Sequence, residues 1–182
     1  MKRSTLDKLI SSTGLIIAVI LVAASFVLFY THNFIHTQVQ NQLSDQKIVF
    51  PAKGSPAITT LPAIDQTNIN KYAGEQMITG QQARVFADNY IAVHLKQIGG
   101  GYTYSQVSTK AMADPTNAAL AGQANVLFQG ETLRGLLLNA YAFDTMALVA
   151  YWAGIGALAA GILLFMLAAL GFSHAGRVSN KK

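Results

Sequence analysis

Two long apolar runs, one near each end of the chain, constrain its fold more than any other feature. The first extends from about Leu9 to Tyr30 and the second from about Met146 to Phe172, and neither contains a charged residue. Each run exceeds the roughly 20 residues that a helix needs to cross a bilayer core. We therefore predict an all-α membrane protein in which two transmembrane helices form an extended antiparallel hairpin, with a small, mainly helical extracytoplasmic domain between them.

The distribution of charge predicts the orientation of the two spans. Of the 13 Lys and Arg residues, six lie in the two short tails, where Asp7 is the one acidic residue, and seven lie between the spans together with seven acids. The positive-inside rule then predicts cytoplasmic tails at residues 1–8 and 173–182 and an extracytoplasmic domain at residues 31–145 of a multi-pass protein in the cytoplasmic (cell) membrane. Because the excess charge lies in these tails, we expect it to bind anionic lipid headgroups and not nucleic acid.

The sequence also bears on whether the first span is cleaved and on whether the chain can form cysteine-dependent sites. Ala23, Ala24 and Ser25 are residues that a signal peptidase accepts, but the apolar run is longer than the roughly 7 to 15 residues of a signal-peptide core. An uncleaved signal anchor is therefore expected. Cysteine is absent, which excludes disulfides, thiolate metal sites and lipoprotein attachment.

The first helix is predicted to continue beyond the membrane. Past Tyr30, apolar residues recur at every fourth position, at Ile35, Val39 and Leu43, which continues one helical face to about Asp45.

The segment that follows has a different composition. Residues 47–51 (KIVFP) favour a short extended piece, and the prolines and glycine of residues 51–72 predict a loop.

A capping box predicts the next helix. Thr79 is followed three residues later by Gln82, and apolar residues at helical spacing continue until Gly99. We expect one helix over this stretch.

Two further helix starts are visible. Thr103 and Gln106 form a second capping box, which predicts a short helix ending near Met112. Asp114 before Pro115 predicts the start of a third helix, since proline is favoured at the first helical position.

Helix-compatible residues from Leu133 to Phe172 indicate that the second span is entered from a helix already formed, although Gly122, Gly130 and Gly135 are potential breaks. In this register Asp144 lies outside the lipid. It could act in proton transfer or partner binding, or simply mark the water boundary.

His32 and His36 are candidate metal ligands. Their spacing of four places both rings on one helix face, as in sites where two imidazoles share a metal. Further ligands would have to come from residues such as His94, Asp45 or Glu131. The alternative is that both histidines are interfacial side chains.

A possible pocket for a small molecule involves Tyr90, His94, Tyr102 and Tyr104. His94 lies on an apolar helical stripe, where a histidine most often packs as core and bonds a backbone carbonyl. Gly99–Gly101 lack the Lys and the glycine spacing of a nucleotide site, so they favour a helix end followed by a turn.

Ala153, Ala157 and Gly161 form a stripe of small residues that lets another helix approach closely. The partner is either the first span, which shows no comparable stripe after Gly14, or another membrane protein or a second copy of the chain.

Four segments of the sequence carry a resemblance to other proteins, namely QLSDQKIVFP at 42–51, ADNYIAVHL at 87–95, YTYSQV at 102–107 and GETLRGLLLNAYAF at 130–143. On these motifs the chain resembles an actinobacterial family of two-span membrane proteins, and the motifs carry no known chemistry. Proteins that look like this often carry the label of an aromatic ring-opening dioxygenase. Such an enzyme needs an iron held by two histidines and a carboxylate in a buried pocket, whereas the only close histidine pair here adjoins a predicted span.

No motif for a nucleophile, a zincin helix or a phosphate loop is present in the sequence, so we expect no enzyme activity and no cofactor. The leading hypothesis is a non-enzymatic accessory or assembly subunit of a larger membrane complex. The alternative is an extracytoplasmic module, anchored by the two spans, that binds or senses a small molecule or a metal.

Overall fold

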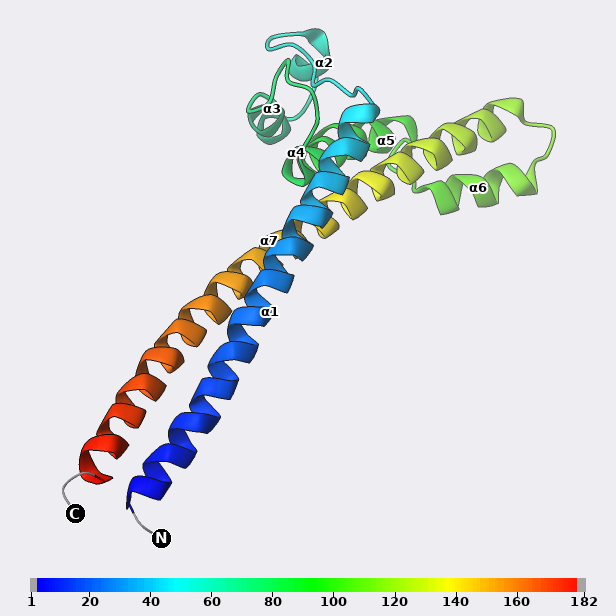
Figure 1. Ribbon diagram of the computed structural model, residues 1–182. Helices are drawn as coiled ribbons and strands as arrows, with labels where there is room; N and C mark the ends of the chain where they lie inside the picture. Colours follow the sequence, from blue (N-terminus) through cyan, green and yellow to red (C-terminus); the bar gives the residue numbers. More distant parts are fainter. Residues whose placement is uncertain (1–2, 180–182) are drawn as a thin grey trace. The chain divides into compact units, whose positions relative to one another are not determined.

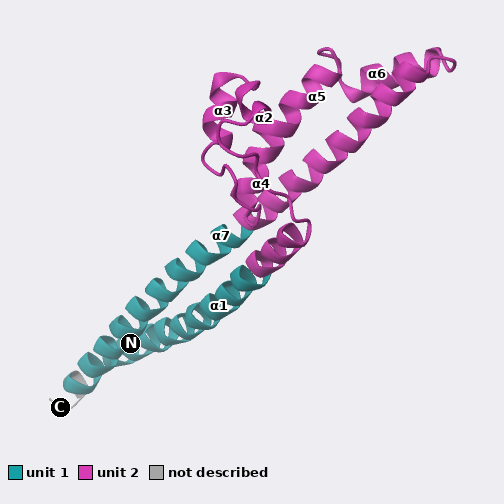
Figure 2. Ribbon diagram, turned by 90° about the horizontal axis from the view of Figure 1, so that it is seen from above, with its two compact units in different colours: residues 1–34, 146–182 teal, residues 35–145 magenta. Residues whose placement is uncertain are grey.

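The computed structural model describes residues 3–179, and all the regular elements among them are helical (Figure 1). In chain order these elements are α1 (Arg3–Asp45), α2 (Pro56–Thr59), α3 (Ala63–Ile69), α4 (Gly80–Phe86), the π-helix η1 (Ala87–Ile91), α5 (Ala92–Ile98), α6 (Tyr104–Ala113) and α7 (Ala118–Ser179). The chain divides into two compact units, which Figure 2 distinguishes by colour. Unit 1 comprises Met1–Phe34 and Met146–Lys182, and unit 2 comprises Ile35–Thr145.

Two helices in the described part of the chain are long and apolar enough to cross a membrane. They correspond to Ser4–Asp45 and Ala118–Arg177, and only 11% of the most apolar window of each is buried inside the protein. Side chains such as Phe26 and Leu163 are more than half exposed. An apolar helix surface of this extent is typical of a helix that faces lipid. The basic residues Lys2, Lys181 and Lys182 of the predicted cytoplasmic tails lie outside the described residues.

In unit 1, small residues spaced by seven line the contact between the two helical segments. α1 buries Ser11, Ala18 and Ser25. α7 buries five residues with the same spacing, namely Ala147, Gly154, Gly161, Ala168 and Ala175. A repeat of seven keeps one face of a helix against its neighbour, and small side chains let the backbones approach closely. The expectation that the first span has no small-residue stripe after Gly14 is wrong, because the stripe repeats every seven residues and not every four.

The glycines of α7 show how close this contact is. A Cβ atom on Gly161 would lie 3.1 Å from the carbonyl oxygen of Ala18, and one on Gly154 would lie 2.8 Å from a ring carbon of Phe29. A Cβ on Gly171 would collide with Ser11. The first residues of α1 therefore meet the last residues of α7.

Unit 2 has a hydrophobic core built from every one of its helices. Val39 and Leu43, on the predicted apolar face of α1, are buried. The core also contains Phe50, Ile58, Leu61, Ile69, Met77, Phe86, Ile91, Leu95, Val107, Leu127 and Leu137. The helix predicted to extend to Asp45 is confirmed. The extended piece predicted for residues 47–51 is found in part, because Lys47 belongs to a turn with a φ of 52°, whereas Val49 forms an isolated antiparallel bridge with Gln76.

The prediction that residues 51–72 form a loop is wrong, because α2 and α3 lie within it. Their prolines do not break helices here. Pro56 is the first residue of α2, and Pro62 occupies the cap position before α3. Proline is tolerated at a helix start because the N–H that it lacks has no partner there.

Both predicted capping boxes are present. Thr79 and Gln82 begin α4, and Thr103 and Gln106 begin α6. The helix predicted from Thr79 to Gly99 contains one unpredicted feature, the π-helix η1, whose wider turn separates α4 from α5.

The helix predicted to start at Asp114 starts later. Asp114 and Pro115 belong to a turn in which Asn117 donates its N–H to the Asp114 carbonyl at 3.1 Å. The Asn117 side chain then accepts the N–H of Leu120 at 3.1 Å and caps α7. From Ala118, α7 continues without interruption through Gly122, Gly130 and Gly135 to Ser179.

Candidate functional site

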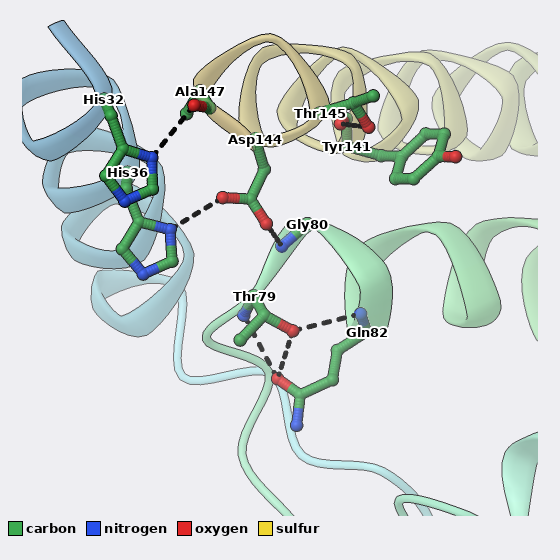
Figure 3. Close-up of polar contacts among 9 residues, drawn as sticks. All are labelled: His32, His36, Thr79, Gly80, Gln82, Tyr141, Asp144, Thr145 and Ala147. Atoms are coloured by element: carbon green, nitrogen blue, oxygen red, sulfur yellow. Dashed lines mark hydrogen bonds and ion pairs between the residues drawn. The ribbon is translucent and has the colours of Figure 1, made fainter. Parts of the chain in front are cut away.

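The carboxylate of Asp144 connects three helices of unit 2 (Figure 3). Its Oδ1 lies 2.8 Å from Nδ1 of His36 on α1, and its Oδ2 accepts the backbone N–H of Gly80 at 3.1 Å. The His36 side chain is 45% exposed and that of Asp144 is 19% exposed. Asp144 therefore does more than mark a water boundary, because it ties α1 and the start of α4 to α7.

Gly80 allows this contact because it has no side chain. A Cβ at position 80 would lie 2.5 Å from the Cβ of Asp144 and 3.0 Å from the Cα of Tyr141. The start of α4 thus packs directly on the surface of α7.

The capping box beside Gly80 binds most of the remaining polar groups at this helix start. The Thr79 hydroxyl accepts the N–H of Gln82 at 3.2 Å, and Oε1 of Gln82 accepts the N–H groups of Ile78 and Thr79 at 2.8 and 3.1 Å. The Gln82 side chain also donates to Glu75 at 3.0 Å. The first N–H groups of a helix have no hydrogen-bond acceptor within the helix. Asp144 provides the acceptor for the Gly80 N–H, and the capping box provides acceptors for the neighbouring N–H groups.

His32 makes its contacts within unit 1. Its Nδ1 lies 2.9 Å from the carbonyl oxygen of Ala147, and its ring packs 5.0 Å from the ring of Tyr151. His36, one helical turn later, uses its own Nδ1 for Asp144. Among residues 3–179 no group of three or more His, Cys, Asp or Glu side chains could hold a metal ion. The structure brings His36 together with one carboxylate, and metal binding by His32 and His36 stays a prediction.

The four residues of the predicted pocket make their contacts with different partners. The ring of His94 packs 4.4 Å from that of Tyr90, and its Nδ1 bonds the Tyr90 carbonyl at 2.7 Å. Tyr102 lies under the ammonium of Lys110 at 3.3 Å.

The ring of Tyr104 lies 5.5 Å from that of Phe128, and both rings line a hollow of about 200 Å³ together with Ala124 and Asn125. In the described chain no hydrogen bond or ring contact joins Tyr90 or His94 to Tyr102 or Tyr104. A pocket shared by all four side chains stays a prediction.

The members of the small-residue stripe also differ from one another. Gly161 is buried against α1, Ala157 is partly buried, and Ala153 is exposed. Gly161 thus packs within the protein, whereas Ala153 is open to a partner.

A polar cleft beside the π-helix was not predicted from the sequence. Its walls come from α3, the segment after it, α4 and η1, and it encloses about 320 Å³. Its lining residues are Asn68, Lys71, Tyr72, Gln81, Arg84, Val85, Asp88 and Asn89. The one signal in the sequence is the polar pair Asp88 and Asn89 within an apolar helical pattern, and it does not indicate a π-helix.

Ion pairs and hydrogen bonds hold several of the side chains that line this cleft. Asp88 pairs with Arg134 of α7 at 3.2 Å and more loosely with Arg84 at 3.9 Å. Asn89 donates to Asp65 of α3 at 2.7 Å. Arg84 also donates to the hydroxyl of Tyr141 at 3.0 Å. These contacts connect α4 and η1 to α3 and to α7.

No protein-family model, no curated protein and no solved structure matched this chain when it was compared with known proteins. The resemblance to the actinobacterial two-span family stays a prediction.

Proposed function

We propose that the protein is a non-enzymatic accessory or assembly subunit of a larger complex in the cytoplasmic membrane. In this proposal α1 and α7 cross the bilayer as an antiparallel hairpin, both termini are cytoplasmic, and unit 2 lies on the extracytoplasmic side. Unit 2 contacts the partner and the spans hold it at the membrane surface.

The observation that carries this proposal is a row of bulky apolar side chains that α7 leaves uncovered in unit 2. Leu136 is 57% exposed, Phe143 is 55% exposed, and Leu133, three residues before Leu136, is 36% exposed. Leu127 and Leu137 of the same helix are only 1% exposed and belong to the core. The helix therefore has one apolar face inside unit 2 and a second one with no cover. Exposed apolar surface of this kind marks interaction sites.

The position of this face indicates which kind of partner covers it. Phe143 comes three residues before Met146, where the proposed second span begins. A partner on this face would therefore sit next to the bilayer, and the exposed Ala153 offers a second small contact within the span. We therefore expect a different membrane protein with a transmembrane helix of its own, and not a soluble partner.

Site-specific photo-crosslinking in cells tests this proposal. A photoreactive residue replaces Leu136, and in a matched control it replaces Ile64, which is 68% exposed but lies on α3. The proposal predicts one discrete product between position 136 and another membrane protein, and no such product from position 64. A product of two copies of this chain, or no product from position 136, would contradict it.

The second candidate function, an anchored extracytoplasmic binding or sensing module, is favoured by the polar cleft beside η1. This cleft is distinct from the apolar face of α7 and is open to a small molecule.

A further inference from the structure

The cleft beside η1 has the dimensions and the chemistry of a small-molecule site. Its volume of about 320 Å³ lies at the small end of the range of roughly 300 to 1,000 Å³ for ligand sites. A single sugar-sized molecule fits such a volume. The cleft lies wholly within unit 2 and involves none of the residues proposed to bind a membrane partner.

A π-helix forms one wall of this cleft. The N–H of Ala92 bonds the carbonyl of Ala87, five residues earlier, and this wider turn carries Asp88 and Asn89. Both side chains are held from outside the turn, by Arg134 and Asp65 respectively. Single π-turns within α-helices are rare and occur frequently at functional sites.

The polar groups that line the cleft are mainly donors without a protein partner. Lys71 donates to Asn68 Oδ1 at 3.0 Å, which leaves two of its three ammonium protons and the Asn68 amide nitrogen unused. Within residues 3–179, the Gln81 amide, the Tyr72 hydroxyl and Nη2 of Arg84 also have no hydrogen-bond partner. A ligand for these groups must be rich in acceptor oxygens.

The charges in the cleft select an anion. Lys71 and Arg84 contribute two positive charges to the lining. Its one carboxylate, Asp88, pairs at 3.2 Å with Arg134, which lies outside the lining, and only loosely, at 3.9 Å, with Arg84. A lysine and an arginine that line the same cleft are suited to a phosphate or a carboxylate. The amides and the tyrosine hydroxyl are suited to the hydroxyl groups of a sugar.

We infer that this cleft binds a small anionic carbohydrate, a single sugar unit that carries a phosphate or a carboxylate. Lys71 and Arg84 hold the anionic group, and Asn68, Tyr72 and Gln81 donate to the hydroxyl and ring oxygens. The inference rests on the second candidate function, an anchored binding or sensing module, and specifies the chemical class of its ligand. It does not depend on the proposed accessory function.

Titration calorimetry on the full-length protein in mild detergent tests the inference with four probes: glucose 6-phosphate, glucuronate, glucose and inorganic phosphate. We expect saturable binding of at least one of the two anionic sugars and at least tenfold weaker binding of glucose and of inorganic phosphate. The difference between glucose 6-phosphate and glucuronate identifies the anionic group. Failure of both anionic sugars to bind, or equal binding of inorganic phosphate, would overturn the inference.

Two substitutions locate the binding. Lys71→Gln removes one cation from an exposed position, and we expect it to weaken binding by about tenfold or more, as for the loss of a charged hydrogen bond. Lys53→Gln removes an exposed lysine outside the cleft and should leave the affinity within about twofold. Equal affinities for both variants would overturn the inference. Loss of sugar binding would leave the crosslink at position 136 unchanged, so the two proposals fail separately.

Discussion

Oδ2 of Asp144, on α7, accepts the backbone N–H of Gly80, the first residue of α4, at 3.1 Å. The two residues are 64 positions apart in the sequence. The bond forms because Gly80 lets the helix start approach α7, and the other oxygen of the same carboxylate binds His36 of α1. Asp144 therefore connects α1, α4 and α7 through one side chain.

Gly80→Ala should destabilise unit 2. The new methyl group would lie 2.5 Å from the Cβ of Asp144, and the backbone of α7 cannot move away without disturbing the core. Overpacking of this kind costs roughly 1 to 3 kcal/mol. Denaturant unfolding in mild detergent, followed by circular dichroism, measures the change.

The control for this substitution is Gly135→Ala, which adds the same methyl group to α7 where nothing lies within 4 Å. Alanine is favoured over glycine in a helix by about 1 kcal/mol, so this variant should be as stable as the wild type or more stable. Equal stability of the two variants would show that α4 does not pack on α7 as described.

A double-mutant cycle on His36 and Asp144 should reveal a direct interaction. Asp144→Ala removes the acceptor of the Gly80 N–H as well as the partner of His36, so it should be the more damaging single change, by roughly 1 to 3 kcal/mol. The coupling energy of the pair should be about 0.5 to 1 kcal/mol, because His36 is partly exposed. The free energy of unfolding of the four proteins provides the measurement, and purely additive effects would argue against the bond.

The contact between α1 and α7 in unit 1 can be tested by disulfide crosslinking, since the natural sequence contains no cysteine. An ideal Cβ on Gly171 lies 3.4 Å from the Cβ of Ser11, close to the separation of about 3.5 to 4.5 Å in a disulfide. Ser11→Cys together with Gly171→Cys should therefore crosslink within one chain when isolated membranes are oxidised.

Ser11→Cys with Ala160→Cys is the matched control for this pair. Ala160 is exposed and lies on the order of 16 Å further along the helix, at about 1.5 Å per residue. Crosslinking of both pairs to the same extent would rule out the register described for unit 1.

The proposed orientation predicts which positions react from outside the cell. A cysteine introduced by Lys53→Cys, in unit 2, should react with a membrane-impermeant thiol reagent in intact cells. A cysteine introduced by Arg177→Cys should react only after the membrane is permeabilised. The reverse pattern would place unit 2 in the cytoplasm and would refute the orientation derived from the charges.

Patterns within short stretches of sequence predicted those helices whose formation depends on interactions between residues close together in the chain. The two apolar runs, the apolar face of Val39 and Leu43, and the capping boxes at Thr79 and Thr103 each act within a few residues, and each is found in the structure. α2 and α3 were missed because Pro56 and Pro62 lie at helix starts, where proline does not interrupt a helix.

The candidate sites depend on contacts between distant residues, which a single sequence does not show. His36 and Asp144 are 108 positions apart, and no pattern near either one indicates the other. The cleft depends on the π-turn at Ala87–Ile91, and Asp88 is held there by Arg134 from α7. The spacing of seven from Ser11 to Ser25 is present in the sequence, but it differs from the spacing of four on which the predicted stripe of Ala153, Ala157 and Gly161 rested.

The central claim, that this protein is a subunit or assembly factor of a membrane complex, is tested most directly by purifying a tagged copy at near-native level. The protein is extracted from its own membranes in mild detergent, the co-purifying proteins are identified and the particle is sized. The account predicts a stoichiometric set of other membrane proteins, which is lost when Leu136 and Phe143 are both replaced by Ser. Recovery of the wild-type protein alone, as a monomer or a small homo-oligomer, would contradict it.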